Sequence, residues 1–306
     1  MISICLPVYN FNISTLIKEL SKQAKLLSVP YEIIIIDDRS DQYTAINKNV
    51  CKDFTFIELS NNIGRSKIRN LFLNYAQYDY LLFIDCDSLI VAPTFLSNYI
   101  EVIKKTPKVI CGGRLYESKC PDSNKRLSWK YGTMRESKLS KDRSKFPNQS
   151  FMTNNFLINK KVLEEIRFDE RITQYGHEDT LFGFELKKKQ ISIIHIDNPL
   201  LNGHIETNNE YLIKTKSSIK NLIIILKFEN FNIELVDDIG LLRYYYKVKR
   251  VENIIMILFE LLKPMIVYLL KRGYVNLYLF DFYKLGLFLE ELKLQTYKKA
   301  ELNYKS

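Results

Sequence analysis

Tyr80-Leu81-Leu82-Phe83-Ile84-Asp85-Cys86-Asp87 is the stretch that decides the fold, because an apolar run ends there in two aspartates one residue apart. Such a run is typical of a strand covered on both faces of a parallel sheet. Residues i and i+2 of a strand point the same way, so Asp85 and Asp87 are candidates to share one cation. Carboxylate oxygens favour Mg²⁺ or Mn²⁺, which also bind phosphate oxygens. The other interpretation is a solvated strand end, or a cap for the following helix.

Upstream of this stretch, runs with the period of a strand alternate with runs with the period of a helix. The second strand run contains four consecutive isoleucines, Ile33 to Ile36, which indicates burial on both faces. Alternation of this kind predicts an open, doubly wound α/β sheet. The strands are expected at 2–8, 31–38, 54–59 and 80–85, and the helices at 13–27 and 64–75.

Polar residues follow each expected strand, at the edge where ligands of doubly wound sheets lie. They are Pro7-Val8-Tyr9-Asn10, Asp37-Asp38 and Asn61-Asn62-Ile63-Gly64. The last group opens a helix that carries Arg65 and Arg69, and a basic helix N-terminus suits a diphosphate or a ribose. Taken alone, the favoured interpretation is an ordinary helix start with a solvated basic face.

Residues 117–149 have a different texture from the flanking segments. They carry nine Lys/Arg against four Asp/Glu, contain the only tryptophan, Trp129, and show few strand signals. This composition predicts a long loop or lid, and long loops in compact domains are usually functional or mobile.

Regular patterns return after this segment. A strand is expected at 151–158, a short helix at 160–166, a helix at 176–189 and a strand at 191–196. From about residue 214 onward, apolar residues recur at helical spacing. The pattern predicts a helical C-terminal region that packs on the sheet domain.

Two adjacent acids, Glu178 and Asp179, open the helix expected at 176–189. A carboxylate beside an acceptor hydroxyl can remove its proton as a new bond forms. The two side chains point in different directions, so only one is a candidate base; alternatively, both acids only complement the helix dipole. His204 lies in a polar loop after the last sheet strand and is a candidate third metal ligand, although a lone histidine is more often structural.

Composition narrows the class of protein. The net charge of +10, from 45 basic and 35 acidic residues, suits anionic partners, but no nucleic-acid-binding module is recognisable. The five cysteines form no CxxC pair and suggest buried, reduced thiols and a reducing compartment.

No signal peptide is expected. The most apolar stretch, 253–270, is interrupted by Glu260, Lys263 and Pro264, so no membrane-spanning helix is expected either.

In this order and spacing, the segments resemble glycosyltransferase family 2, whose members have the GT-A fold. The resemblance covers about residues 2–210. Ile68 replaces the alanine that usually precedes Arg-Asn in the family. The matching segments are Ile2 to Asn10 (the opening strand), Glu32 to Ser40 ("EIIIVDDGS"), Asn62-Ile63-Gly64 with Arg69-Asn70 ("N-x-G…A-R-N"), Asp85-Cys86-Asp87 (DxD), and Arg167 to Glu170 with Gly176 to Asp179 ("F-D-E…G-x-E-D").

The resemblance implies a role for each matched residue. Asp179 would be the catalytic base, with Glu178 its neighbour on the acceptor side. Asp87 would hold the metal, together with Asp85 and His204. Donor binding would fall to Pro7, Val8, Tyr9, Asn10, Asp37, Asp38, Asn62, Gly64, Arg65, Arg69, Asp85 and Cys86, and acceptor binding to Asn155, Gly176 and His177.

The resemblance also implies a reaction. An inverting transfer would move a sugar from a nucleotide-sugar, with UDP favoured, to a glycan or lipid-linked hydroxyl, assisted by Mn²⁺ or Mg²⁺, in bacterial polysaccharide biosynthesis. The QxxRW sequence of processive polysaccharide synthases is absent from the chain. Two alternatives stay open: a non-catalytic, degenerate sugar-nucleotide-binding protein, and a nucleotidyltransferase on a similar fold.

The expected organisation has two parts. Residues 1–212 form a GT-A catalytic domain with a mixed, mostly parallel sheet: a nucleotide-sugar half at about 1–100 and an acceptor half at 101–212, with the lid at 117–149. Residues 213–306 form the helical region. Its basic and aromatic stretch 250–306 predicts peripheral contact with an anionic membrane; a packed accessory region or a homodimer interface is the alternative. The expected location is cytoplasmic, either free or peripheral at the inner face of the membrane.

Overall fold

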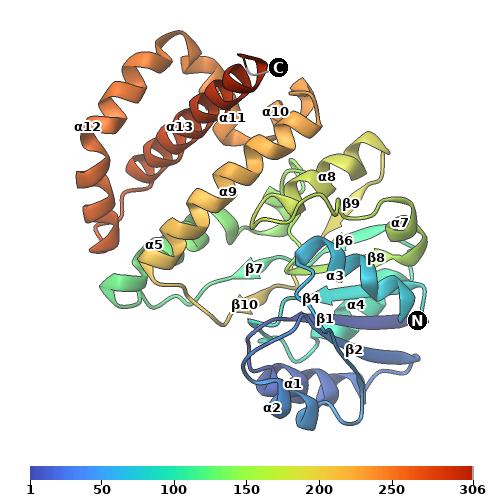
Figure 1. Ribbon diagram of the computed structural model, residues 1–306. Helices are drawn as coiled ribbons and strands as arrows, with labels where there is room; N and C mark the ends of the chain where they lie inside the picture. The colour runs from blue at the N-terminus through green and yellow to red at the C-terminus, as the bar shows by residue number, and fades with distance from the viewer. Residues whose placement is uncertain (305–306) are drawn as a thin grey trace. The chain divides into compact units, whose positions relative to one another are not determined.

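The computed structural model describes residues 1–304, and the side-chain surroundings of residues 1–295. The chain forms two compact units, drawn in Figure 1. The sheet unit comprises residues 1–118, 133–173 and 178–204. The helical unit comprises residues 119–132, 174–177 and 205–306.

A seven-stranded sheet organises the sheet unit, in the order β3-β2-β1-β4-β8-β6-β9. Neighbouring strands are parallel except at β8, which runs antiparallel to both β4 and β6. The predicted mixed, mostly parallel sheet is confirmed. The strands are β1 (Ile2–Val8), β2 (Tyr31–Asp37), β3 (Thr55–Glu58), β4 (Tyr80–Ile84), β6 (Val109–Cys111), β8 (Asn155–Asn159) and β9 (Ile193–His195).

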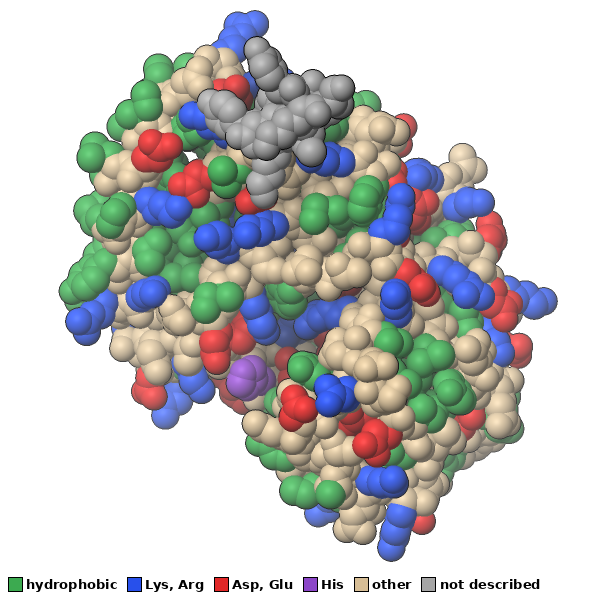
Figure 2. Space-filling model, in the orientation of Figure 1, with side chains coloured by type: hydrophobic (Ala, Val, Ile, Leu, Met, Phe, Trp, Pro, Cys, Tyr) green, Lys and Arg blue, Asp and Glu red, His purple; other side chains and the backbone are tan. Residues whose placement is uncertain are grey.

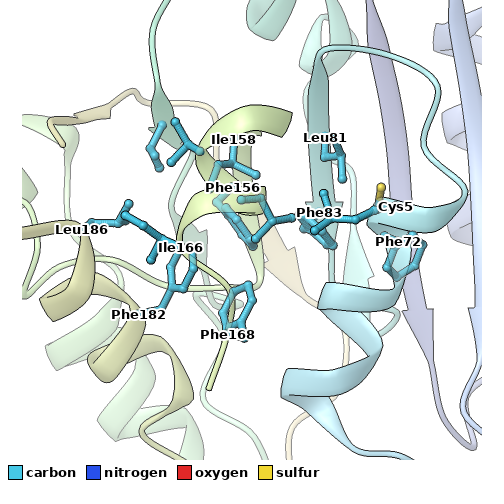
Figure 3. Packing of buried hydrophobic residues seen from close by; sticks show 14 of the residues in the cluster. Cys5, Phe72, Leu81, Phe83, Phe156, Ile158, Ile166, Phe168, Phe182 and Leu186 are labelled. Atoms are coloured by element: carbon cyan, nitrogen blue, oxygen red, sulfur yellow. The ribbon is translucent and has the colours of Figure 1, made fainter. Parts of the chain in front are cut away.

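The strands are apolar on both faces because helices cover the sheet on both sides. Alternate residues of β2 enter different cores: Ile34 and Ile36 join one, Ile33 and Ile35 the other. Figure 3 shows the first core, where Phe83 and Phe156 stack across neighbouring strands with ring centroids 4.9 Å apart. The covering helices are α1 (Ser14–Ala24), α2 (Thr44–Val50), α3 (Arg65–Leu71, continued by the 3₁₀ turn η1, Phe72–Asn74), α4 (Phe95–Ile103), α7 (Lys160–Glu165) and α8 (Glu178–Lys188).

A second, three-stranded sheet lies in the same unit, in the order β5-β10-β7. Its strands are only two or three residues long: β5 (Ser88–Leu89), β7 (Arg114–Leu115) and β10 (Leu200–Asn202). β5 begins directly after the Asp85-Cys86-Asp87 run, so this small sheet fixes what faces those carboxylates.

The segment 117–149 is not the structureless loop that its composition suggested. It contains η2 (Ser123–Lys125), α5 (Arg126–Tyr131), a π-helical turn η3 (Gly132–Glu136) and α6 (Ser140–Arg143). Leu127 is fully buried in the helical unit. In the sheet unit, the buried Arg143 guanidinium donates to the carbonyls of Lys138, Cys111, Gly112 and Ile196. These contacts order a segment whose sequence has little periodicity.

The predicted helical C-terminal region is confirmed as the bulk of the helical unit. Its first helix begins with a capping box, in which Thr207 and Glu210 satisfy each other's backbone N–H groups. The helices are α9 (Asn208–Phe228), α10 (Ile233–Asp238), α11 (Gly240–Val248, followed by η4, Lys249–Val251), α12 (Glu252–Lys271) and α13 (Leu277–Tyr304).

The structure of α12 differs from the expectation that the apolar stretch 253–270 is interrupted. The helix runs through Glu260, Lys263 and Pro264 without a break. By length and composition, the helical stretch Gly240–Lys271 is apolar enough to cross a membrane, and only 17% of its most apolar window is buried. On its own this is weak evidence, since composition says nothing about where the helix lies.

Candidate active site

Asp38 shapes the loop that leads into α3. Its two carboxylate oxygens accept the backbone N–H groups of Ile63 (2.7 Å) and Gly64 (3.0 Å). Asn62 donates its side-chain amide to the Asp38 carbonyl at 3.1 Å. Gly64 has a φ of +81°, a conformation that favours glycine. Asp38 is thus a scaffold for the predicted donor loop, and burial raises its pKa despite the two N–H donors.

Asp37, beside it at the end of β2, leaves one oxygen free. Its Oδ1 accepts the N–H of Ser40 at 2.6 Å, whereas its buried Oδ2 has no hydrogen-bond partner among the described residues. Asn10 adopts a left-handed φ of 49° and ties the ends of β1 and β2 together. Its N–H donates to the Ser40 hydroxyl at 2.8 Å, and its Oδ1 accepts the N–H groups of Asp41 and Gln42.

Arg69 points from α3 to the end of β4. Its side chain is only 2% exposed, and it donates to Oδ1 of Asp85 at 3.0 Å. The guanidinium also lies over the Phe168 ring, 5.7 Å from the centroid. The neighbouring Asn70 fixes the same turn, since its side chain exchanges two 2.9 Å hydrogen bonds with the backbone of Phe168. The Arg-Asn pair therefore joins the DxD run to the Phe-Asp-Glu segment.

Asp87 and His204 are brought together by the small sheet. Asn202 of β10 is paired with Ser88 of β5, and the N–H of Gly203 donates to the Asp87 carbonyl at 2.8 Å. Burial and the adjacent Asp85 charge raise the pKa of Asp87, whereas the nearby Arg114, Arg65 and His204 act to lower it. The His204 ring also meets Phe11 edge-on, with centroids 6.2 Å apart.

Arg114 is a charged residue of this site that was not predicted from the sequence. It lies on β7, is hydrogen-bonded to Asn202, and has Glu136 at 4.0 Å. Burial opposes its charge, but the nearby Tyr116, Glu136, Asp87 and Asp85 raise its pKa, so it stays a cation. A single arginine in a two-residue strand forms no pattern that would mark it in the sequence. It lies near Asp87 because β10 pairs with both β7 and β5.

Glu178 and Asp179 have opposite electrostatic environments at the start of α8. Glu178 is only 5% exposed, and its Oε1 accepts from Arg65 at 3.1 Å. Burial alone would raise the pKa of Glu178, but the Arg65 and Arg69 charges hold it below its usual value. Burial and the Glu178 charge raise the pKa of Asp179 to about 7. One carboxyl is therefore a fixed anion, and the other titrates near neutrality.

Buried polar atoms without partners gather in this part of the sheet unit. In the described residues they are Asp37 Oδ2, Ser66 Oγ, Arg69 Nε, Asn154 Oδ1 and Glu178 Oε2. All belong to strand ends, to α3 or to the start of α8. A buried polar atom that is left unpaired costs free energy, so this concentration favours a polar ligand as the missing partner.

The carboxylates fit a divalent cation in part. Asp85 and Asp87 form a like-charged pair that a cation would relieve. However, Arg69 already neutralises Asp85, and the side chains described, those of residues 1–295, contain no group of three or more His, Cys, Asp or Glu placed to hold a metal. Asp87 and His204 are the better pair, and the oxygens of a bound diphosphate would have to complete the ligand set.

The remaining predicted residues lie in different parts of the structure. Asn155 is 1% exposed and fully engaged: it donates to the carbonyls of Gly113 and Asn198 and accepts from the Tyr99 hydroxyl. These bonds hold the Asn155 amide in place, and its role in acceptor binding stays a prediction. Gly176 and His177, both with positive φ, belong to the helical unit. Pro7, Val8, Tyr9 and Cys86 lie at the ends of β1 and β4, and the exposed Tyr9 is open to a ligand.

A mostly parallel sheet with aspartates at its carboxyl edge and a second small sheet behind them defines the GT-A class of sugar-transferring domains. A family model described as "Glycosyl transferase family 2" matches residues 3–167, more than half of the chain. The chain therefore belongs to glycosyltransferase family 2.

Curated relatives match over shorter stretches. An uncharacterised glycosyltransferase of Haemophilus influenzae is 29% identical over 111 residues, which are 36% of this chain and 36% of the relative. The poly-β-1,6-N-acetyl-D-glucosamine synthase of Staphylococcus aureus is 34% identical over 115 residues, 35% of this chain and 26% of the synthase. The matches thus span about a third or less of these relatives' lengths.

Solved structures share the fold. A mannosyltransferase of Pyrobaculum calidifontis, in complex with GDP-Man and Mn²⁺, has a TM-score of 0.52 at 13% identity, covering 74% of this chain and 64% of that one. The glucosyl-3-phosphoglycerate synthase of Mycobacterium tuberculosis, with Mg²⁺ and UDP, has a TM-score of 0.51 at 13% identity, covering 73% and 78%. The GT-A fold prediction is confirmed; identities this low carry nothing further.

Proposed function

We propose that this chain is an inverting glycosyltransferase that moves a sugar from a nucleotide-sugar, with UDP favoured, to a hydroxyl of a glycan or lipid-linked acceptor. The observation that carries the proposal is the pairing of a fixed anion, Glu178, with a neighbouring Asp179 whose pKa is about 7. Both lie in the unit that presents Asp85 and Asp87 at the sheet edge. Family membership and relatives named as glycosyltransferases support the same class.

The donor would lie along the carboxyl ends of β1, β2 and β4. Asp37 offers its unpaired oxygen to the nucleoside, and Tyr9 offers an exposed ring. The basic start of α3 and its backbone N–H groups suit the diphosphate. Arg69 fixes the Asp85 carboxylate, so that the site does not reorganise when the donor binds.

Asp87 and His204 are proposed to hold Mn²⁺ or Mg²⁺. When bound, the ion supplies positive charge beside the leaving nucleoside diphosphate. Arg114 lies near Asp87 as a permanent cation and would add to that positive charge. The protein thus provides its own electrostatic stabilisation of the leaving group, independent of metal occupancy.

Asp179 is the proposed general base. It would accept the proton of an acceptor hydroxyl as that oxygen bonds to the anomeric carbon and the bond to the diphosphate breaks, which inverts the carbon. A pKa near 7 suits this role because the base is then ionised at neutral pH and still basic enough to accept a proton. Glu178 cannot serve as readily, since Arg65 lowers its basicity.

The same proposal assigns a role to each part of the chain. Residues 1–212 would act as the catalytic domain, with 1–100 for the donor, 101–212 for the acceptor and 117–149 closing over the donor to exclude water. Gly176 and His177 would contact the acceptor. The chain would act in the bacterial cytoplasm, at the inner face of the membrane.

A donor screen tests the proposal. Purified chain is incubated with UDP-, GDP- and TDP-sugars plus Mn²⁺, and the phosphorus products are identified. Release of a nucleoside diphosphate from one donor supports transferase chemistry and names the donor. Release of pyrophosphate would instead support a nucleotidyltransferase. Nucleotide binding without turnover would support a degenerate binding protein, and absence of both turnover and nucleotide binding would contradict the proposal.

A further inference from the structure

α12 presents two apolar faces, of which one is already covered. Phe259, Ile266 and Leu270 are fully buried in the helical unit. The Phe259 ring meets Phe282 of α13, with centroids 6.0 Å apart. Gly286 of α13 allows this approach, because a Cβ there would lie 2.2 Å from the Phe259 ring. This buried face packs on α13. The packing does not account for the exposed apolar residues on the other side of α12.

The opposite face forms an exposed apolar stripe. At about 100° per residue its members fall within an arc of roughly 120°, and they span about 26 Å of helix. Figure 2 shows hydrophobic side chains gathered over α12. An exposed patch of this length marks an interaction surface. The stripe consists of Val251, Ile254, Ile257, Leu258, Leu261, Met265 and Tyr268, each exposed.

Basic residues stand at both ends of the stripe. Lys249 and Arg250 precede α12, Lys271 and Arg272 end it, and all are exposed. The Arg272 guanidinium lies over the Tyr268 ring, 5.5 Å from its centroid. Exposed tyrosines flank the helix on both sides: Tyr244 and Tyr246 before it, Tyr274 and Tyr278 after it. Apolar residues between cations and tyrosines match the chemistry of an anionic bilayer surface.

We propose that the stripe of α12 docks on the surface of an anionic membrane, with the helix lying in the plane of the bilayer. This proposal deepens the proposed location at the membrane by naming the surface that binds it, and it does not depend on the transfer reaction. Docking in the plane keeps α12 packed on α13. A spanning α12 would carry the Lys263–Glu290 ion pair, 2.7 Å long, into hydrocarbon, or would break it.

Charge also argues against a second copy of the chain as the occupant. Both ends of the stripe are basic. Two stripes packed together, parallel or antiparallel, would therefore set basic end against basic end. An anionic lipid surface meets the same charges with attraction, and adds burial of the apolar side chains.

Vesicle flotation of the full 306-residue chain tests the proposal. The protein is mixed with vesicles of phosphatidylcholine alone or of phosphatidylcholine with phosphatidylglycerol. We expect binding to the anionic vesicles that weakens as salt is raised. The double variant Leu261→Glu/Met265→Glu should reduce the partition coefficient about tenfold or more. Leu26→Glu/Ile46→Glu is the matched control, because it adds the same two charges to the sheet unit. Leu26 and Ile46 are 78% and 50% exposed, and Leu261 and Met265 are 75% and 51% exposed.

Several results would overturn the proposal. Equal binding of parent and double variant would show that the stripe is not the contact. A concentration-dependent dimer in sedimentation, abolished by the double variant while vesicle binding is absent, would assign the stripe to a second copy. Circular dichroism of the double variant confirms that it is folded, so that loss of binding is not loss of structure.

Depth measurement separates docking from spanning. Leu261→Trp places a fluorophore at the middle of α12, and the parent signal of the only native tryptophan, Trp129, is subtracted. Brominated lipids should quench the new tryptophan most strongly when the bromine is near the headgroups. Strongest quenching from the bilayer centre would show that α12 crosses the membrane, and would contradict an in-plane helix.

Discussion

Sugar transfer by this chain should depend steeply on pH just below neutrality. The active form of a general base is the deprotonated form, and burial with the Glu178 charge raises the pKa of Asp179 to about 7. Activity should therefore rise with pH through about 7 and level off above it. One pH unit below the pKa only about a tenth of the carboxyl is ionised, so the rate should be roughly tenfold below its plateau.

Glu178→Gln separates the two causes of that shift. The substitution removes the neighbouring negative charge, which favours the ionised form of Asp179. The acid limb of the profile should therefore move to lower pH. Glu165→Gln is the control, since Glu165 forms an exposed ion pair with Lys189 on the surface and should leave the limb in place.

The assay is nucleoside diphosphate release under saturating donor and acceptor, measured across pH for the parent and both variants. Asp179→Asn should lower the rate by about 10²–10⁴-fold and leave donor binding intact. An acid limb near the ordinary pKa of an aspartate, or one that Glu178→Gln leaves unmoved, would refute the assignment of Asp179 as the base.

Three further substitutions test other parts of the account. Asp38→Asn replaces one carboxylate oxygen, which accepts a backbone N–H of the α3 loop, with an NH₂ group that faces that N–H. The substitution should lower the free energy of unfolding by about 1–3 kcal/mol, measured by urea unfolding. It should also weaken UDP binding, measured by calorimetry. Gly286→Ala should cost about 1–3 kcal/mol in urea unfolding, because its methyl group collides with the Phe259 ring. Gly240→Ala should not, because its nearest neighbour would be the Arg243 side chain at an ordinary contact distance of 3.8 Å. Arg114→Gln should slow transfer at least about tenfold, and Arg114→Lys should recover part of the rate. Equal rates for the parent and both variants would remove Arg114 from the site.

The long elements of the fold were predictable because burial leaves a pattern in the sequence. β1 and β2 read as continuous apolar runs and lie within a residue of their expected bounds. The alternation with α1 and α3 then predicted the doubly wound sheet. α2 was missed: its sequence, Thr44–Val50, has little periodicity, and Asn47 anchors it by hydrogen bonds to the backbone of Phe11 and Ile13.

The small three-stranded sheet could not be predicted from the sequence. β5, β7 and β10 are too short for any period to be visible, and their pairing joins segments far apart in the chain. This pairing places Arg114 and His204 beside Asp87. The sequence made His204 a candidate ligand through its polar loop and the family resemblance, but it contained no signal for Arg114. The hydrogen bonds of the Asn155 amide were not predictable for the same reason, because they join it to residues far away in the chain.

Calorimetric titration of UDP into the purified chain, with Mn²⁺ or with EDTA, decides whether the edge around Asp87 is a donor site. Binding with Mn²⁺ that is strongly weakened by EDTA and by Asp87→Ala, but not by the exposed-surface control Leu26→Ala, is the predicted result. Unchanged binding in Asp87→Ala, or no binding of UDP, GDP or TDP under either condition, would contradict the assignment of the Asp85-Cys86-Asp87 edge as the nucleotide-sugar site.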